Sequence, residues 1–325
     1  MASSETTPRY SRRMVWLAAF IVVLFGGYSA GWFYVGNMLE GQVRTALANA
    51  GQKGVAADCA NPTARGFPFR IGVYCDKVSF DDGKGVNVSA GALRSAAQVY
   101  NPFHVVSELD GPATVGLGSA GSLQLDWKAL RASARLATPL PERVSIEGTD
   151  IAAGPVSAAP QLNAKTFEGH MRPKGSDLDV AGSIGDLTAA AGLVQGRVLP
   201  PLSGQIDATI ANGVALLRSG AADLKGQSAT IRNLWLSTGP NTGVGVKGSI
   251  AADAAGLIDA DLTLTIRNAK GLAQVAAQAF PEASKQINNA MLGLAMLGEN
   301  TSVPLRIVKG KATLGFISLG DIPPI

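Results

Sequence analysis

The feature of this sequence that most restricts its fold is an uncharged segment near the N-terminus. From Met14 to Leu39, 26 residues pass without a charged side chain, and a helix needs roughly 20 apolar residues to cross the hydrocarbon core of a bilayer. Arg12 and Arg13 precede the segment, and an aromatic triplet at residues 32–34 lies near its far end. Cations favour the cytoplasmic side of a membrane, and aromatic residues favour its interface. The sequence therefore predicts a transmembrane helix, with the N-terminus in the cytoplasm and the chain after residue 40 outside it.

A cleaved signal peptide is the competing interpretation of this segment. Signal peptides have an apolar core of about 7–15 residues followed by a small-x-small cleavage site, which Ser29-Ala30-Gly31 matches loosely. The uncharged segment is longer than such a core, and aromatic residues follow the site directly. The sequence favours an uncleaved anchor, and either interpretation exports the rest of the chain.

The residues after the anchor continue at helical spacing. Leu39, Val43, Leu47 and Ala50 fall on one helical face, and Gly51 follows them, a pattern that predicts an amphipathic helix. The chain is therefore expected to consist of a cytoplasmic tail (1–13), a transmembrane anchor (14–36), a juxtamembrane helix (37–51) and an exported β-rich domain (52–325).

Both cysteines, Cys59 and Cys75, lie beyond the predicted anchor. An even number of cysteines in an oxidising compartment is typical of disulfides, whereas two unrelated buried thiols are the alternative. We predict a disulfide between the two residues. Because Cys75 ends a predicted strand, Cys59 is expected on the neighbouring segment.

Beyond residue 52, apolar residues alternate with polar ones, as they do in strands with one buried face. In the first such run, one face carries Phe67, Phe69, Ile71, Val73 and Cys75. Further runs lie at 123–128, 177–184, 205–210 and 258–267, and a hairpin is predicted around Lys309-Gly310-Lys311. One-sided strands joined by short glycine-containing turns favour antiparallel sheets over a parallel one.

Helical spacing beyond the anchor is confined to short segments. It predicts helices at 271–280 and 282–297, and one or two helical turns within 186–197 and 212–219. The sequence contains no repeat of fixed period and no long linker. The predicted fold class is mainly β: extended, curved antiparallel sheets with a few short helices, preceded by one transmembrane helix.

The charge distribution argues against nucleic acid as a partner. Charged residues are 16% of the chain, compared with roughly 25% in ordinary soluble proteins. The net charge is +4, but Arg9, Arg12 and Arg13 lie in the N-terminal tail and the other cations are scattered. Nucleic-acid-binding domains instead gather their cations into a patch or stripe.

Motifs that carry chemistry are lacking in this sequence. Two GxGxxG matches, at 116–121 and 243–248, each run into a strand-like stretch, whereas a dinucleotide fingerprint needs a helix after its glycines. The two histidines, His104 and His170, lie far apart and have no metal-ligand spacing. No P-loop or EF-hand pattern occurs. We therefore expect no catalytic residues, no cofactor and no metal, and a protein that is not an enzyme.

Three stretches of the chain carry a family resemblance. The segments ARGFPFRIGVYCD (64–76), SAGALRSAAQVY (89–100) and GKATLGF (310–316) resemble the family catalogued as domain of unknown function 2125. This resemblance implies a membrane-anchored envelope protein of alphaproteobacteria, with its main domain in the periplasm and its helix in the inner membrane. More loosely, the order of membrane helix, long β region, late helix and final strand is similar to AsmA-like envelope proteins. That similarity implies an apolar groove connected with phospholipid traffic, and it transfers no site residues.

Two functional hypotheses follow for the exported domain. In the first, one-sided strands form an apolar groove that binds lipid and serves envelope homeostasis; the candidate groove residues are Phe67, Phe69, Ile71, Val73, Leu262, Leu264 and Ile266. The expected partners are then the membrane and phospholipid. In the second, the same faces form a closed core, and the domain is a scaffold that recruits another envelope protein through a sheet edge. A hydrolase without a recognisable motif is a third alternative.

Overall fold

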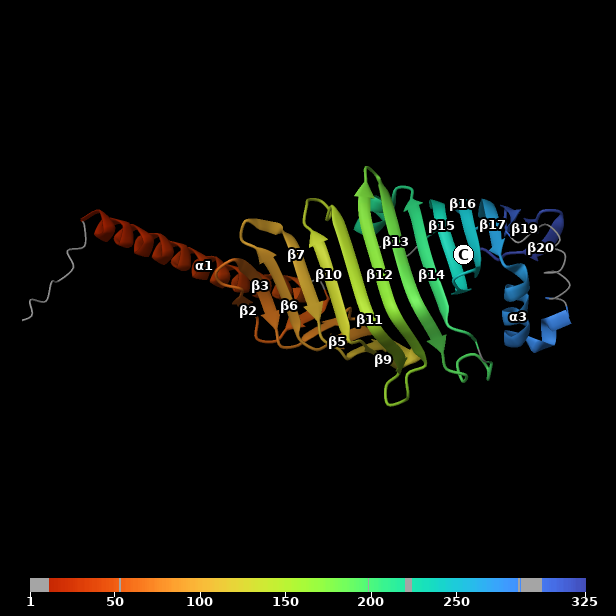
Figure 1. The fold of residues 1–325 in the computed structure, drawn as a ribbon, viewed down its shortest axis with the longest axis horizontal. Helices are drawn as coiled ribbons and strands as arrows, with labels where there is room; N and C mark the ends of the chain where they lie inside the picture. Colours follow the sequence, from red (N-terminus) through yellow and green to blue (C-terminus); the bar gives the residue numbers. More distant parts are fainter. Residues whose placement is uncertain (1–11, 53, 198, 220–223, 286, 288–299) are drawn as a thin grey trace, which may run out of the picture.

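The computed structural model describes residues 12–52, 54–197, 199–219, 224–285, 287 and 300–325. A long helix, α1 (Arg12–Gln52), leads into one large antiparallel sheet (Figure 1). Two short α-helices, α2 (Gly213–Ser219) and α3 (Ala269–Ala279), and two 3-10 turns at Gly118–Ala120 and Pro281–Ala283 complete the described elements. The predicted fold class, mainly antiparallel β with an apolar N-terminal helix, is confirmed.

The strands are short in the first part of the chain and long in the second. The short ones are β1 (Ala56–Cys59), β2 (Thr63–Arg65), β3 (Arg70–Cys75), β4 (Val78–Asp81), β5 (Val86–Ala90), β6 (Leu93–Gln98), β7 (Asn101–Leu109), β8 (Ala113–Leu117), β9 (Ser122–Asp126) and β10 (Ala129–Arg135). The long ones are β11 (Arg143–Pro155), β12 (Leu162–Lys174), β13 (Asp177–Ala189), β14 (Leu202–Ile210), β15 (Ser228–Gly239), β16 (Thr242–Ala252), β17 (Ile258–Arg267) and β18 (Asn300–Val308). The chain ends with β19 (Lys311–Leu314) and β20 (Ile317–Asp321).

Irregular residues interrupt two of the long strands. Asp150 in β11 and Asp186 in β13 have positive φ angles of 48° and 50°. Asp186 lies where the register of β13 with β14 shifts between Ile184 and Leu187, and a bulge of this kind bends a strand and increases its twist. The left-handed residue at 150 also changes which residues share a side. A Cβ added to Gly148 would lie 2.9 Å from Cδ1 of Ile151, so these two positions face the same way.

The sheet forks at β11. Residues 143–149 of this strand pair with β10, whereas residues 152–155 pair with β9. One branch continues from β10 through β7, β6 and β3 to β2. The other continues from β9 through β8, β5 and β4 to β1. The N-terminal part of the sheet is therefore divided into two branches, while β12 to β20 follow one another in a single series.

A disulfide joins the two branches. The sulfur atoms of Cys59 in β1 and Cys75 in β3 lie 2.04 Å apart, as the sequence predicted. Cys59 and Cys75 are both buried, as are Ala90 and Ala97, which belong to opposite branches. The small size of these side chains limits the apolar area that this region buries, so a covalent link between the branches has much to contribute.

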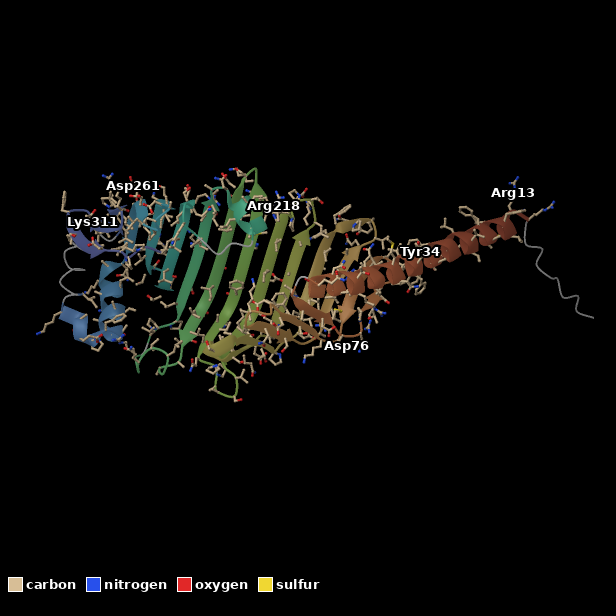
Figure 2. All side chains as sticks on the ribbon, turned by 180° about the vertical axis from the view of Figure 1, so that it is seen from behind. Arg13, Tyr34, Asp76, Arg218, Asp261 and Lys311 are labelled. Carbon is tan, nitrogen blue, oxygen red and sulfur yellow. A yellow bond between two sulfur atoms is a disulfide. The ribbon has the colours of Figure 1, made fainter. Side chains whose placement is uncertain are left out.

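Helix α1 is continuous through the predicted anchor and the predicted juxtamembrane helix. Its 41 residues span about 60 Å at 1.5 Å per residue. It is the one described helix that is long and apolar enough to cross a membrane. Its C-terminal part contacts β1, β2 and β3, while the other end, with Arg13, projects away from the sheet (Figure 2).

The structure corrects the sequence analysis at the first predicted strand. Phe67, Pro68 and Phe69 form a turn, and β3 begins only at Arg70. Gly66 has a φ of +115°, and its carbonyl accepts a hydrogen bond from the Arg70 amide at 2.9 Å. Pro68 has no amide hydrogen to donate to a neighbouring strand. Phe67 and Phe69 therefore do not alternate with Ile71 and Val73 on one strand.

The helical predictions had mixed outcomes. Helix α3 confirms the prediction at 271–280, and α2 confirms that at 212–219. The segment 186–197 contains the end of β13 and hydrogen-bonded turns rather than a helix. Most of the helix predicted at 282–297 lies outside the described residues.

Candidate functional site

One face of the sheet carries an apolar surface that continues from strand to strand. Cross-strand neighbours connect Ile71 in β3 to Leu262 in β17 without interruption. Between them, in order, stand Ala97, Val105, Ala134, Val144, Met171, Val180, Ala208, Ile231 and Gly248. We call the side of the sheet that bears these residues the apolar face.

A second row of neighbours on the apolar face runs parallel to the first. It leads from Ile146 in β11 to Val303 in β18. Its members between these ends are Gly169, Gly182, Ile206, Leu234, Val246 and Leu264. Every member of this row is apolar or glycine, so the face offers dispersion contacts and no charged side chain along this line.

The middle of the apolar face is open to solvent. Ile206 and Leu234 are 41% and 36% exposed, Ile146 is 39% exposed, and Leu236, two residues beyond Leu234, is 50% exposed. Apolar residues on the inward face of a regularly alternating strand are usually buried, so these exposed fractions are unusual. They mean that the described part of the chain leaves these side chains only partly covered.

Both ends of the apolar face are covered. Cys75 lies two residues from Val73 on the same face of β3, and its disulfide brings β1 of the other branch onto this side. At the opposite end Leu262 is 7% and Ile266 3% exposed, and Leu262 packs in a cluster with Ala260, Ile307 and Ala312. The face is therefore an ordinary core at its two ends and an exposed surface between them.

The structure brings five of the seven predicted groove residues to one face. Ile71 and Val73 lie near one end of the apolar face, and Leu262, Leu264 and Ile266 lie near the other. The two outliers, Phe67 and Phe69, lie in the turn before β3 and contact or adjoin α1 instead. The sequence analysis did not identify Ile206, Leu234 and Leu236 as site residues. Alternation in β14 marks Ile206, but the exposure of these side chains depends on tertiary covering that the pattern does not contain.

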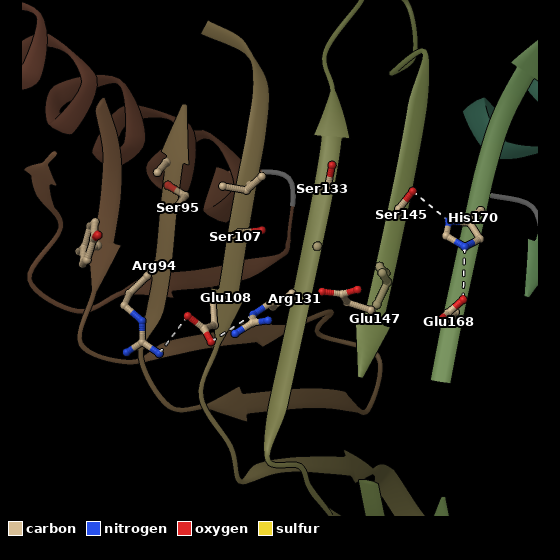
Figure 3. Close-up of a pocket in the computed structure, with 15 residues that line it drawn as sticks. Arg94, Ser95, Ser107, Glu108, Arg131, Ser133, Ser145, Glu147, Glu168 and His170 are labelled. Atoms are coloured by element: carbon tan, nitrogen blue, oxygen red, sulfur yellow. Dashed lines mark hydrogen bonds and ion pairs between the residues drawn. The ribbon is translucent and has the colours of Figure 1, made fainter. Parts of the chain in front are cut away.

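The opposite face is polar, and its charged side chains form cross-strand pairs (Figure 3). Glu108 lies between two arginines. Its carboxylate is 3.8 Å from Nη2 of Arg94 and 3.6 Å from Nε of Arg131. These side chains line an open depression of about 470 Å³ together with residues of β11 and β12. Opposite charges on neighbouring strands stabilise a sheet modestly, and exposed pairs of this kind contribute roughly 0–1 kcal/mol.

Ser145, His170 and Glu168 in this depression have the residue types of a hydrolytic triad. Ser145 Oγ lies 2.9 Å from His170 Nδ1, but the Glu168 carboxylate is 3.9 Å from Nε2, beyond hydrogen-bond range. A second Ser–His pair on this face joins Ser133 Oγ to Nε2 of His104, at 3.1 Å. The amides of β11 and β12 beneath the triad residues are engaged in the sheet, so no oxyanion hole is evident there. The arrangement is that of repeated cross-strand polar pairs.

The two GxGxxG motifs, which the sequence analysis did not accept as cofactor sites, lie in or between strands. The GxGxxG match at 243–248 lies inside β16, and the match at 116–121 leads from β8 into β9. Within the described ranges, no three His, Cys, Asp or Glu side chains are grouped so as to hold a metal ion. The absence of catalytic, cofactor and metal sites from the whole chain stays a prediction.

Asp179 is the most strongly perturbed acid on the polar face. Its side chain is 11% exposed and accepts hydrogen bonds from Thr209 at 2.7 Å, Arg172 at 2.8 Å and Arg232 at 3.2 Å. These donors hold the pKa of Asp179 well below its usual range. Arg232 also pairs with Asp207, and that pairing lowers the pKa of Asp207. The cluster connects β12, β13, β14 and β15.

We predict that Asp179→Asn reduces the free energy of unfolding at pH 7 by about 1–3 kcal/mol, the range for hydrogen bonds to a charged group. The lower end is expected because the arginines are 54% and 41% exposed. Since the folded-state pKa is depressed, this stabilisation is present above about pH 4, the unfolded value, and is lost as pH falls through the folded-state pKa. Urea unfolding at pH 7 and pH 3 measures both effects. A variant whose stability falls with acid as steeply as that of the wild type would contradict the assignment.

Comparison with known proteins gives a family match. A family described as uncharacterized protein conserved in bacteria (DUF2125) matches residues 32–323. No curated protein and no solved structure matches the chain. The family match covers the end of α1 and nearly all of the sheet, and its description specifies no activity.

Proposed function

The chain belongs to the bacterial family DUF2125, and from this premise we propose that it is an envelope protein, held in the inner membrane by α1, that binds phospholipid acyl chains on the apolar face. The proposal places the sheet in the periplasm, because Arg12 and Arg13 precede the span and cations favour the cytoplasmic side. It assigns no enzymatic activity. A role in lipid traffic or envelope homeostasis agrees with the similarity to AsmA-like proteins.

The exposure of Ile206, Leu234 and Leu236 is the observation that carries the proposal. Large apolar patches on a monomer normally mark a binding surface. The row from Ile146 to Val303 crosses eight strands, which corresponds to about 34 Å at the usual strand spacing. One leaflet of a bilayer has a hydrocarbon thickness of about 15 Å. The apolar face is therefore long enough for an acyl chain laid across the strands.

The composition of the face favours a lipid over a protein as its occupant. A protein partner brings polar backbone and side-chain groups that need hydrogen-bond partners. An acyl chain needs only apolar contact, which is what the uncharged row supplies. The anchor also keeps the sheet beside a bilayer, where phospholipid is the most abundant apolar ligand.

The alternative function, a scaffold for another envelope protein, is favoured by one separate observation. Strand β20 pairs with β19, and no described strand covers its other edge. Ile317 and Leu319 on this strand are 65% and 57% exposed. An open edge with exposed apolar residues can accept a strand from a partner.

Mass spectrometry of bound lipid tests the proposed function. Residues 54–325 are produced without detergent, checked for folding by circular dichroism, and extracted for lipid. We expect phospholipid with the wild-type sequence and with Gln205→Asp, and a loss of most of it with Ile206→Asp. Gln205 and Ile206 are adjacent in β14 and lie on opposite faces, so the pair controls for added charge. Folded wild-type protein without phospholipid would overturn the proposal.

A further inference from the structure

An aromatic cluster ties the turn before β3 to helix α1. The Phe67 ring stacks on Phe33, with centroids 5.7 Å apart, and meets Trp32 edge-on at 5.6 Å. Tyr28 also approaches Phe67, at 6.4 Å, and its hydroxyl donates a hydrogen bond to the Pro68 carbonyl. Trp32 Nε1 donates to the Arg70 carbonyl at 2.9 Å. These contacts fix the position of the turn along the helix axis.

The cluster fixes the turn at the level where α1 leaves the bilayer. If the helix enters hydrocarbon at Met14, a core about 30 Å thick ends about 20 residues later, near Tyr34. Tyr28, the first helix residue that contacts Phe67, lies about 9 Å before that point at 1.5 Å per residue. The Gly66–Phe69 turn therefore lies beside the outer boundary of the hydrocarbon.

Further aromatic side chains near this turn are exposed to solvent. The amide of Val99 donates to the Phe69 carbonyl at 3.0 Å, so the β6–β7 turn at Val99–Tyr100 is its neighbour. Phe69 is 72%, Tyr100 78% and Phe103, near the start of β7, 66% exposed. Arg65 and Arg70, which flank the Gly66–Phe69 turn, are also exposed. Aromatic residues next to cations are typical of segments at a membrane interface.

We propose that the turns Gly66–Phe69 and Val99–Tyr100 insert into the interface of the outer leaflet of the membrane that α1 crosses. This inference rests on α1 being a transmembrane anchor, as the proposed function has it. The continuity of the exposed aromatics with the helix surface selects the leaflet as the occupant, rather than a protein. The insertion gives the domain a second point of attachment, so that β3, β6 and β7, where the apolar face begins, stand at the lipid surface.

Spin-label depth measurements on the full-length protein in phospholipid nanodiscs test this inference. The two cysteines of the sequence form the disulfide, so single cysteines can be introduced at Phe69, Tyr100, Leu24 and Phe316 and labelled without reductant. Leu24 lies in the middle of the predicted span and reports the anchor. Phe316, fully exposed and far from α1 in the sheet, reports the aqueous phase.

Labels at positions 69 and 100 are expected to be more accessible to oxygen than to a water-soluble nickel chelate, as at 24, with the opposite order at 316. If the label at position 24 is in lipid while the labels at 69 and 100 are as accessible to the nickel chelate as the label at 316, the insertion of the turns is refuted and the transmembrane anchor stands. If 24 is also aqueous, the anchor fails and the inference fails with it. If the label at position 24 is in lipid and the labels at 69 and 100 are protected from both oxygen and the nickel chelate, the turns contact protein instead. That result would also refute the insertion.

Discussion

Replacing Ile266 by aspartate is expected to destabilise the sheet by about 4 kcal/mol or more, enough to prevent folding of a marginally stable domain. Ile266 is 3% exposed in β17 and lies opposite Val244 and Thr301. The substitution removes a buried aliphatic side chain and puts an unpaired carboxylate in its place. Circular dichroism and the yield of folded protein measure the result. The matched control, Ile266→Val, should cost only about 1 kcal/mol.

The same substitution at Ile206 should behave differently, although both residues alternate in strands and lie on the apolar face. Ile206 is 41% exposed, so an aspartate there can keep its water, and the expected loss of stability is about 1 kcal/mol. If Ile206→Asp unfolds the protein as completely as Ile266→Asp, the middle of the face is a closed core and not an open surface.

Removal of the disulfide is expected to reduce the free energy of unfolding by about 3 kcal/mol, the value for a closed loop of this length. Cys59 and Cys75 are separated by 16 residues, and the bond joins β1 of one branch to β3 of the other. Urea unfolding of the Cys59→Ala/Cys75→Ala variant measures the loss. Hydrogen exchange should show that β1 and β4 lose more protection than β13 to β17.

Treatment of the wild-type protein with reductant provides the control for this variant. It should lower stability by a similar amount, while the double variant should not respond to reductant. Two free thiols in protein isolated from cells, or a double variant as stable as the wild type, would contradict the role given to the bond.

Individual strands and the long helix could be predicted because the order of apolar and polar residues within each element indicates its type. Alternation in 258–267 identified the side of β17 that bears Leu262, Leu264 and Ile266. The uncharged segment identified α1, and the even cysteine count identified the disulfide. These signals are local, so they can be recognised without knowing which other segments of the chain pack against the element.

The arrangement of the strands could not be predicted in the same way. Ile71 and Leu262 belong to one row only because ten successive pairings align them, and the register between distant strands leaves no trace in either strand alone. The fork at β11 depends on which half of the strand meets β9 or β10. At Phe67 and Phe69 the alternation itself was misleading, because Gly66 and Pro68 impose a turn within an apparently regular run. The openness around Ile206 depends on what the rest of the chain leaves uncovered.

Photo-crosslinking in living cells tests most directly whether the apolar face holds phospholipid. A photoreactive amino acid is introduced at Ile206 in one variant of the full-length protein and at Gln205 in another, and adducts are identified by mass spectrometry after irradiation. The two positions are adjacent in β14, at the same distance from the membrane anchor, and differ in the face they occupy. The account predicts phospholipid adducts at 206 and none above background at 205. Protein adducts alone at 206, or equal lipid adducts at both positions, would contradict it.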